Sequence, residues 1–362
     1  LSFLAKAGFQ RVDTPILEDS DLFARKGGGE MTGLLYTFSE PDGRRLSLRP
    51  EFTTSIIRMY VESDGLPLPL RWSYAGPVFR FDRAGGGRCR QFIQVGAEII
   101  GDCSLKADAE VIGSAIEGLC RLGLPGASVR LGHVETLSRL FAAFELSDSA
   151  RRFVTGNLVG LKRGQTTAGR LLQRAREAGL VDEETASIDG WSAKRAREAL
   201  QHLILEEGAR GPMGRRTAEE IMARLERKSS QSRDPVEMDR ALDLASRLVG
   251  LEGRASATLA EARALASRSG ARTDAFDPLE ELVEALVESG IGADTLVVDL
   301  GMARGMAYYT GALFDLAAGQ GAGTLGGGGR YDGLVQTLGG PGVPALGFAY
   351  DMEAVSVAAR PL

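Results

Sequence analysis

Stretches that favour strands and stretches that favour helices are segregated along this chain into three zones. Short apolar runs separated by Gly, Pro and Asp turns fill residues 1–133, and similar runs return over residues 291–362. The zone between them, residues 134–290, is rich in Arg, Ala, Glu and Leu and predicts helix almost throughout. We therefore expect a mixed α and β protein with strands on both sides of a mainly helical zone.

Local patterns predict the strands of the first zone. The turn sequence Pro41-Asp42-Gly43 lies between two apolar runs and predicts a hairpin, because Asp-Gly tolerates the positive φ of tight turns. Further apolar runs predict strands of an antiparallel sheet at 70–74, 78–81 and 92–100. Apolar residues at helical spacing over 111–119 predict a helix that ends at Gly123, and a strand at 129–131 follows.

The helix before the third zone has the clearest boundaries in the sequence. We expect Asp277 as its N-cap, Pro278 as its first residue and Gly290 after its end. The apolar run 296–300 then predicts a strand, and we expect residues 308–316 to pair with it.

The glycine-dense segment of the third zone contains a misleading motif. Residues 321–326 match the G-x-G-x-x-G pattern of dinucleotide-binding proteins, but Arg330-Tyr331-Asp332 follows rather than the helix of a βαβ unit. We therefore set the dinucleotide interpretation aside and predict no cofactor. Glycines in such a segment let a strand or a ligand approach the backbone closely.

The overall composition excludes several classes of protein. Hydrophobic residues make up 44% of the 362 residues and charged residues 25%, which is typical of soluble globular proteins. The formal net charge, 43 − 48 = −5, gives no overall positive field for nucleic acid. No apolar run reaches the ~18 residues that a membrane span needs.

Cysteine and histidine usage argues against disulfides and metal sites. Cys89, Cys103 and Cys120 are an odd number and lack metal-ligand spacing, which indicates reduced thiols in a cytoplasmic protein. The chain has only two histidines, His133 and His202, so catalysis built on histidine and histidine-rich metal sites are not expected.

Polar residues inside strand-like runs are the candidates for chemistry. Gln94 and Glu98 alternate along one predicted strand and therefore share a face. Together with Glu51 and a nearby tyrosine, they can supply one carboxylate for an amino group and a Glu–Tyr pair for a polar side chain. Each residue taken singly can equally be an exposed strand residue or a member of a structural ion pair.

Four segments resemble signatures of histidyl-tRNA synthetases. Residues 48–53, LRPEFT, are similar to the LRPE-x-T signature, and residues 76–98, GPVFRFDRAGGGRCRQFIQVGAE, resemble class II motif 2. Residues 304–311, RGMAYYTG, resemble RGLDYYTG, and residues 326–334, GGGGRYDGL, resemble the signature that follows it. The resemblance implies an α+β class II synthetase core, an antiparallel sheet flanked by helices, built from 1–133 and 291–362 with 134–290 as a mainly helical insertion.

The same resemblance implies a histidine pocket. Glu51 and Thr53 would hold the α-amino group of the ligand, and Gln94 its main-chain polar groups. Glu98 and Tyr309 would read the imidazole ring. Tyr308 and Tyr331 would line the pocket, and Arg304 would face the ligand carboxylate. Arg80 and Arg88 match the motif 2 positions that grip ATP phosphates in the family.

Motif 3 departs from the pattern of that family. The family reads roughly GFGFGIERL, whereas residues 347–355 read GFAYDMEAV. The arginine that clamps the terminal phosphate of ATP in the family corresponds to Ala354, and Asp351 stands where a glycine belongs. Ala307 replaces the aspartate of RGLDYYTG. Because losing one preorganised donor costs about 10²–10³ in rate, the resemblance implies a broken ATP clamp.

This combination resembles the ATP phosphoribosyltransferase regulatory subunits, a paralogous family of histidyl-tRNA synthetases. The resemblance implies a non-catalytic homodimer that senses L-histidine and joins the short-form catalytic subunit in a hetero-oligomer, with no tRNA and no membrane as partner. Because the sequence ends at Leu362, we expect no C-terminal anticodon-binding domain. Two alternatives stay open: a synthetase-like enzyme that passes histidine or a relative to a non-tRNA acceptor, and an interaction module with a vestigial pocket.

Overall fold

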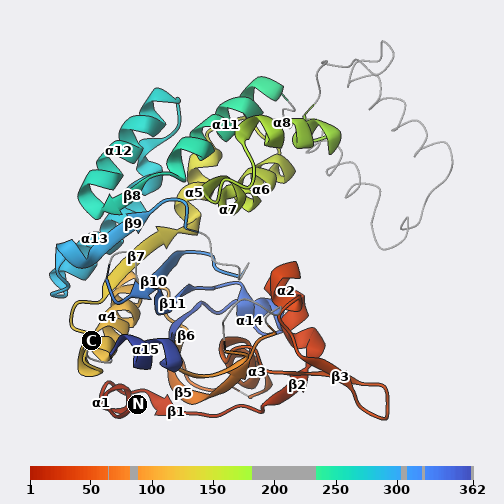
Figure 1. Ribbon diagram of the computed structural model, residues 1–362, viewed down its shortest axis with the longest axis vertical. Coiled ribbons are helices and arrows are strands. Elements are labelled where there is room, and N and C mark those ends of the chain that lie inside the picture. Colours follow the sequence, from red (N-terminus) through yellow and green to blue (C-terminus); the bar gives the residue numbers. More distant parts are fainter. Residues whose placement is uncertain (64, 82–88, 182–233, 303–307, 320–322, 360–362) are drawn as a thin grey trace. The chain divides into compact units, whose positions relative to one another are not determined.

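The computed structural model describes residues 1–63, 65–81, 89–181, 234–302, 308–319 and 323–359 (Figure 1). The chain divides into two compact units. The first contains residues 1–136, 251–263 and 274–362, and the second contains residues 137–250 and 264–273. All described residues of the candidate site belong to the first unit.

A large mixed sheet forms the centre of the first unit. Within the described residues its strands follow the order β1-β5-β6-β12-β11-β10-β7-β9-β8, and all neighbours are antiparallel except β1 with β5 and β7 with β9. The strands are β1 (Gln10–Arg11), β5 (Leu70–Phe79), β6 (Gln91–Ile100), β7 (Ser128–His133), β8 (Glu252–Arg254), β9 (Leu296–Asp299), β10 (Ala312–Ala317), β11 (Thr324–Arg330) and β12 (Ala345–Asp351).

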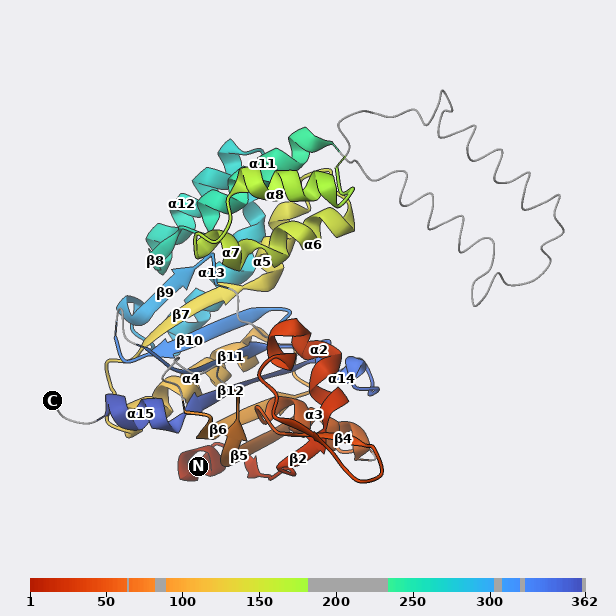
Figure 2. The same cartoon turned by 45° about the vertical axis from the view of Figure 1, so that its right-hand side comes forward.

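Helices flank this sheet, as the sequence predicts for an α+β fold. Helix α4 packs against β6, β10, β11 and β12, while α2, α3 and α14 contact one another (Figure 2). A second sheet in the order β2-β4-β3 contains the predicted hairpin. Its strands and the helices of this unit are β2 (Leu17–Asp19), β3 (Thr37–Ser39), β4 (Arg45–Leu48), α1 (Ser2–Lys6), α2 (Ser20–Thr32), α3 (Thr53–Glu62), α4 (Leu105–Arg121), α13 (Asp277–Glu288), α14 (Leu334–Thr337) and α15 (Met352–Ala358).

The described part of the second unit is helical. It contains helices with apolar faces that pack on one another, with α11 against α6, α7 and α8. Helix α12 runs from the first unit into the second, because the division falls after residue 263. The helices are α5 (Val134–Phe141), α6 (Asp148–Gly156), α7 (Leu158–Lys162), α8 (Ala168–Glu177), α11 (Pro235–Leu248) and α12 (Ala255–Arg268).

The expected end of the helical insertion at residue 290 is wrong. Residues 251–263 and 274–290 belong to the first unit. The reason is that β8 pairs with β9 as the edge of the large sheet, and α13 packs against α4. A residue-by-residue helical pattern cannot show to which sheet a helix is attached.

Three local expectations also need correction. The runs predicted as two strands at 70–74 and 78–81 are one strand, β5, which ends at Phe79. Pro77 has no N–H to donate, but β1 pairs with β5 only at residues 72 and 73, so no strand needs a hydrogen bond from it on that side. Asp277 lies inside α13 rather than capping it, and its carboxylate accepts from Arg263 at 2.8 Å. Strand β10 pairs with β7 and β11 and not with β9, because β7 lies between them.

Other local expectations are confirmed. Gly43 adopts a φ of +88° in the turn of the β3–β4 hairpin, and Gly123 a φ of +87° just after α4. The sequence analysis did not identify the cap of α4, which is Ser104: its hydroxyl accepts from the backbone N–H of Ala107 at 3.2 Å. The glycine-dense segment continues as strand β11 rather than as a helix, which agrees with setting the dinucleotide motif aside.

A buried ion pair joins α4 to the end of β11. The guanidinium of Arg330 donates to the carboxylate of Asp108 at 2.8 and 3.0 Å, and the two residues are only 7% and 8% exposed. Arg330 also donates to the carbonyl oxygens of Asp102 and Ser104 at 3.0 and 3.3 Å. Because every donor direction is used, the pair is satisfied despite its burial.

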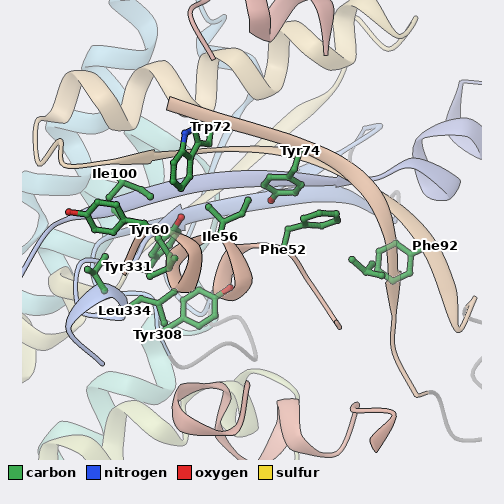
Figure 3. Close-up of a cluster of buried hydrophobic side chains, with 14 residues drawn as sticks. Phe52, Ile56, Tyr60, Trp72, Tyr74, Phe92, Ile100, Tyr308, Tyr331 and Leu334 are labelled. Carbon is green, nitrogen blue, oxygen red and sulfur yellow. The ribbon is translucent and has the colours of Figure 1, made fainter. Parts of the chain in front are cut away.

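The apolar core of this unit lies between α3 and the sheet (Figure 3). Phe52 and Tyr74 stack with ring centroids 4.5 Å apart, and both are fully buried. Tyr308 and Tyr331 meet edge to face at 5.7 Å in the same cluster. The predicted pocket tyrosines are therefore part of a packed core, which fixes the direction of their hydroxyl groups.

Candidate functional site

The turn that starts α3 holds the first carboxylate of the site. Both oxygens of Glu51 accept from the backbone N–H of Thr54, at 3.0 and 3.2 Å, so this side chain caps the helix start. Glu51 is only 3% exposed, and burial raises its pKa. A buried carboxylate of this kind is costly without a cation, and a ligand ammonium group matches it.

Strand β6 places the second carboxylate beside this turn. Gln94 and Glu98 share a face of the sheet, as the alternation predicts, and Gln94 Oε1 accepts from the backbone N–H of Phe52 at 3.1 Å. Glu98 is only 1% exposed. Helix α3 and strand β6 are thus tied together at the point where Glu51, Thr53, Gln94 and Glu98 meet.

Three hydroxyl groups surround the carboxylate of Glu98. Thr53 Oγ1 and Tyr74 OH donate to Oε1 at 2.7 and 3.1 Å, and Tyr331 OH donates to Oε2. Burial raises the pKa of Tyr74 and of Tyr331 well above the usual range, so both phenols remain proton donors. The three donors come from α3, from β5 and from the residue after β11.

Two glycines make room for this cluster on neighbouring strands. Glu98 and Gly347 face each other across the β6–β12 pair, and a β-carbon at position 347 would overlap Glu98 Oε2. A β-carbon at Gly96 would overlap the hydroxyl of Tyr74. Both positions therefore need glycine for close approach rather than for an unusual φ.

Burial raises the pKa of Glu98 to about 8, and the nearby Glu51 carboxylate adds to the increase. The hydroxyl donors act in the opposite direction, because they stabilise the ionised form. In the free protein the carboxyl group of Glu98 is therefore mostly protonated at neutral pH. An imidazole ring offers both a proton acceptor and, once protonated, a cationic partner for this group.

The free energy of unfolding should fall as the pH rises from about 5 to about 8. The pKa of Glu98 is about 8 in the folded protein against 4.5 for the ordinary group, so in this window the folded state holds a proton that the unfolded state has lost. One such proton gives a slope of at most about 1.4 kcal/mol per pH unit.

Denaturant titrations at several pH values measure this slope. A Glu98→Gln variant has no carboxyl group to titrate at this position and should lose stability less steeply with pH than the wild type. Equal slopes for the two proteins would contradict the assignment of the raised pKa to Glu98.

A small pocket opens beside Glu51. Tyr308 lines it together with an apolar wall from α2, namely Leu22, Phe23 and Met31. Thr54 and Leu334 complete the lining. Tyr309 lies next to Tyr308, with ring centroids 4.9 Å apart. The structure therefore brings together Glu51, Thr53, Gln94, Glu98, Tyr308, Tyr309 and Tyr331.

The predicted arginines have different outcomes. Arg304 and Arg88 lie outside the described residues, as does Ala307. Arg80 Nε donates to the carbonyl of Pro50 at 2.9 Å, and its guanidinium lies 5.0 Å from the ring centroid of Phe92. Arg80 is thus placed next to the turn that carries Glu51.

Sequence reasoning missed Tyr74 and the apolar wall from α2. Tyr74 lies in an apolar strand run, where a tyrosine that bonds to a carboxylate has the same local pattern as an ordinary core tyrosine. Leu22, Phe23 and Met31 lie before the first signature of the family. Only the tertiary contacts show that these residues belong to the site.

The start of α15 differs from a phosphate-binding site. Asp351 is the N-cap, and its carboxylate accepts from the backbone N–H of Ala354 at 3.0 Å. Asp351 pairs with Gln94 across the β6–β12 ladder, so its carboxylate lies on the same face of the sheet as Gln94. Position 354 has no cationic side chain.

Within the described ranges, no group of three or more His, Cys, Asp or Glu side chains is arranged to hold a metal ion. Likewise, no described helix is both long and apolar enough to cross a bilayer. The three cysteines are free and exposed.

The fold is that of class II aminoacyl-tRNA synthetases, with the polar cluster on the sheet face covered by α3. A family model described as histidyl-tRNA synthetase matches residues 1–202 and 209–355. The chain therefore belongs to the histidyl-tRNA synthetase family.

Curated relatives support this membership. The chain is 30% identical over 349 residues to the histidine–tRNA ligase of Pyrococcus horikoshii. The matched region covers 96% of this chain and 66% of that protein. It is also 30% identical over 349 residues to the ligase of Methanocaldococcus jannaschii, with 96% and 67% covered. The chain thus spans about two thirds of the length of these relatives.

Solved structures share the fold. A Bacillus halodurans C protein described as an ATP phosphoribosyltransferase regulatory subunit/histidyl-tRNA synthetase aligns with a TM-score of 0.64 at 23% identity, covering 99% of this chain and 77% of that one. A histidine–tRNA ligase subunit from Alicyclobacillus acidocaldarius aligns with a TM-score of 0.56 at 25% identity, covering 99% and 89%.

Proposed function

We propose that this chain is a non-catalytic member of the family that binds L-histidine and regulates a short-form ATP phosphoribosyltransferase catalytic subunit. The observation that carries the proposal is the contrast between two ends of one sheet face. The cluster around Glu51 and Glu98 retains its polar groups, whereas the start of α15 has an alanine where the phosphate-clamping arginine is expected.

The retained cluster suits a ligand with two basic nitrogen groups. Glu51 is a buried carboxylate for an α-ammonium group, and Glu98 lies among hydroxyls where a polar ring can be read. A pocket that hydrogen-bonds its ligand rejects apolar analogues strongly, because its polar groups would be left unpaired. These features favour histidine over apolar amino acids.

The start of α15 disfavours ATP activation. Phosphate groups bind where helix N–H groups and cations are available. Here the carboxylate of Asp351 already accepts the N–H of Ala354, and it would repel a triphosphate nearby. Synthetase chemistry needs that phosphate stabilisation, so we infer that histidine is bound but not adenylated.

Linkage gives the physical basis of the proposed regulatory role. If histidine binds one state of a complex more tightly than another, it shifts the activity of the catalytic partner. The Bacillus halodurans C protein of the same fold is described as an ATP phosphoribosyltransferase regulatory subunit/histidyl-tRNA synthetase. We therefore propose the short-form catalytic subunit as the partner, with the present chain as a homodimer inside a hetero-oligomer.

The competing function is a synthetase-like enzyme, which the ligase names of the curated relatives favour. Histidine-dependent ATP–pyrophosphate exchange on the purified chain separates the two. We expect histidine binding by calorimetry without exchange above background. Exchange above background would establish an adenylate-forming enzyme and overturn the non-catalytic proposal.

A second assay tests the regulatory part. Adding the chain to a short-form catalytic subunit should raise the rate of ATP phosphoribosyl transfer, and histidine should then lower it. The matched control is a chain with Glu98→Gln, which should still activate the partner but respond to histidine only at higher concentration. No change in rate on adding the wild-type chain would overturn the partner assignment.

A further inference from the structure

We propose that Tyr74 is a positioning residue for histidine recognition, which holds Oε1 of Glu98 so that Oε2 is the atom offered to the ligand. The inference rests on the proposed function, because it concerns the same pocket. It adds a residue that the family signatures do not contain and assigns different roles to the two oxygens of one carboxylate.

The hydrogen bonds around Glu98 are unequal. Oε1 accepts from two hydroxyls, Thr53 Oγ1 at 2.7 Å and Tyr74 OH at 3.1 Å, which fills the lone pairs of one carboxylate oxygen. Among the described residues, Oε2 accepts from one hydroxyl, that of Tyr331. Once Glu98 is ionised, Oε2 is therefore the oxygen with a lone pair left for a ligand N–H.

The surroundings of Tyr74 fix its hydroxyl at this place. Its ring is fully buried and stacks on Phe52, with an angle of 15° between the planes. Gly96 leaves the space that the hydroxyl occupies. The alternative acceptor, the carbonyl oxygen of Phe348, is 3.4 Å away, farther than the carboxylate, and it is uncharged. The single phenol proton therefore goes to Glu98.

A fixed Oε1 also prevents the carboxylate from turning. A Glu side chain has a broad torsion at its last bond, so two donors on one oxygen are needed to define its plane. Gly347 lies directly beneath Oε2 and allows the carboxylate to sit against the sheet. Tyr74 and Thr53 thus hold Oε1 of Glu98, and the missing side chain at Gly347 leaves the space that Oε2 occupies.

The test is a Tyr74→Phe variant compared with a Tyr350→Phe variant. Tyr350 is also buried, and its hydroxyl donates to the carbonyl of Ala115 at 2.5 Å, on the opposite face of the same sheet. Both changes remove one buried phenol donor and keep the ring. Only the first removes a contact with Glu98.

We expect calorimetry to show histidine binding weakened about tenfold or more by Tyr74→Phe, as for a hydrogen bond to a charged group. Tyr350→Phe should bind histidine as the wild type does. Carbon-13 NMR of the Glu98 carboxyl group in the free protein should show its titration midpoint raised by Tyr74→Phe and unchanged by Tyr350→Phe, because only the first loses a donor that stabilises the ionised form.

A second pair of variants tests the space that Gly347 leaves for the carboxylate of Glu98. Gly347→Ala should displace Glu98 and weaken binding at least as much as Tyr74→Phe does. Gly342→Ala is the control, since a β-carbon there meets nothing within 4 Å. Any effect specific to position 347 then comes from the displaced carboxylate rather than from alanine itself.

The possible failures are distinguishable. If the wild type binds histidine and Tyr74→Phe binds it within twofold, with an unchanged Glu98 titration, Tyr74 is only a core residue and this inference is overturned. If the wild type itself shows no histidine binding between pH 6 and 9, the proposed function fails, and the role of Tyr74 in recognition fails with it.

Discussion

Replacing Glu98 with glutamine is expected to weaken histidine binding about 10- to 150-fold at neutral pH, because a hydrogen bond to a charged group contributes about 1.5–3 kcal/mol. Glutamine keeps the size of the side chain, so the pocket should keep its shape. It cannot carry the negative charge that pairs with a protonated imidazole ring. Its NH₂ group also points a donor at hydroxyls that now donate to Glu98.

Isothermal titration calorimetry of the two proteins measures this effect. Glu281→Gln is the matched control, since Glu281 is an exposed residue of α13. Thermal unfolding should show that the Glu98 variant is folded. A Glu98 variant that binds histidine as tightly as the control would remove Glu98 from the recognition site.

The second large effect is on stability. An Arg330→Met variant should lose about 3–5 kcal/mol of unfolding free energy, because it leaves the carboxylate of Asp108 buried without its partner. Burial already raises the pKa of Asp108, with Arg330 as the main opposing influence. Without the guanidinium this pKa rises further, so the loss should be smaller at pH 5 than at pH 8.

Chemical denaturation of a double-mutant cycle measures the coupling. Arg330→Met with Asp108→Leu replaces both charges by apolar groups, and it should recover much of the stability lost in the single variant. The double variant also leaves the carbonyls of Asp102 and Ser104 without the guanidinium, so recovery should be incomplete. A double variant less stable than either single one would contradict this account.

The sequence predicts features that depend on neighbouring residues. The β3–β4 turn needs a residue that tolerates positive φ, and the Asp-Gly pair in the sequence predicts this turn. Gln94 and Glu98 share a face because strand periodicity is two, and the hydrogen bonds of both side chains confirm it. The family signatures likewise identified residues that the fold brings together around α3 and β6.

Features that depend on distant residues were not predictable. The pairing of β7 between β9 and β10 is decided by the whole sheet, and no pattern in 296–316 contains it. The continuity of β5 through Pro77 depends on where β1 ends. The role of Tyr74 depends on the absence of side chains at Gly96 and Gly347, which are on other strands.

The strand order of the large sheet has a consequence for how the protein folds. Strand β6 comes from the first part of the chain and β12 from the last, and the hydrogen bond between Tyr331 and Glu98 joins residues 233 positions apart. Contacts between residues so far apart in the sequence form slowly, because a long loop must close before they contribute to stability. The cost of closing that loop rises only with the logarithm of its length, so the intervening segment can vary in size with little effect on stability. The polar cluster around Glu98 therefore forms only when residues 98 and 331 come together. A ligand bound at this cluster would stabilise that long-range contact.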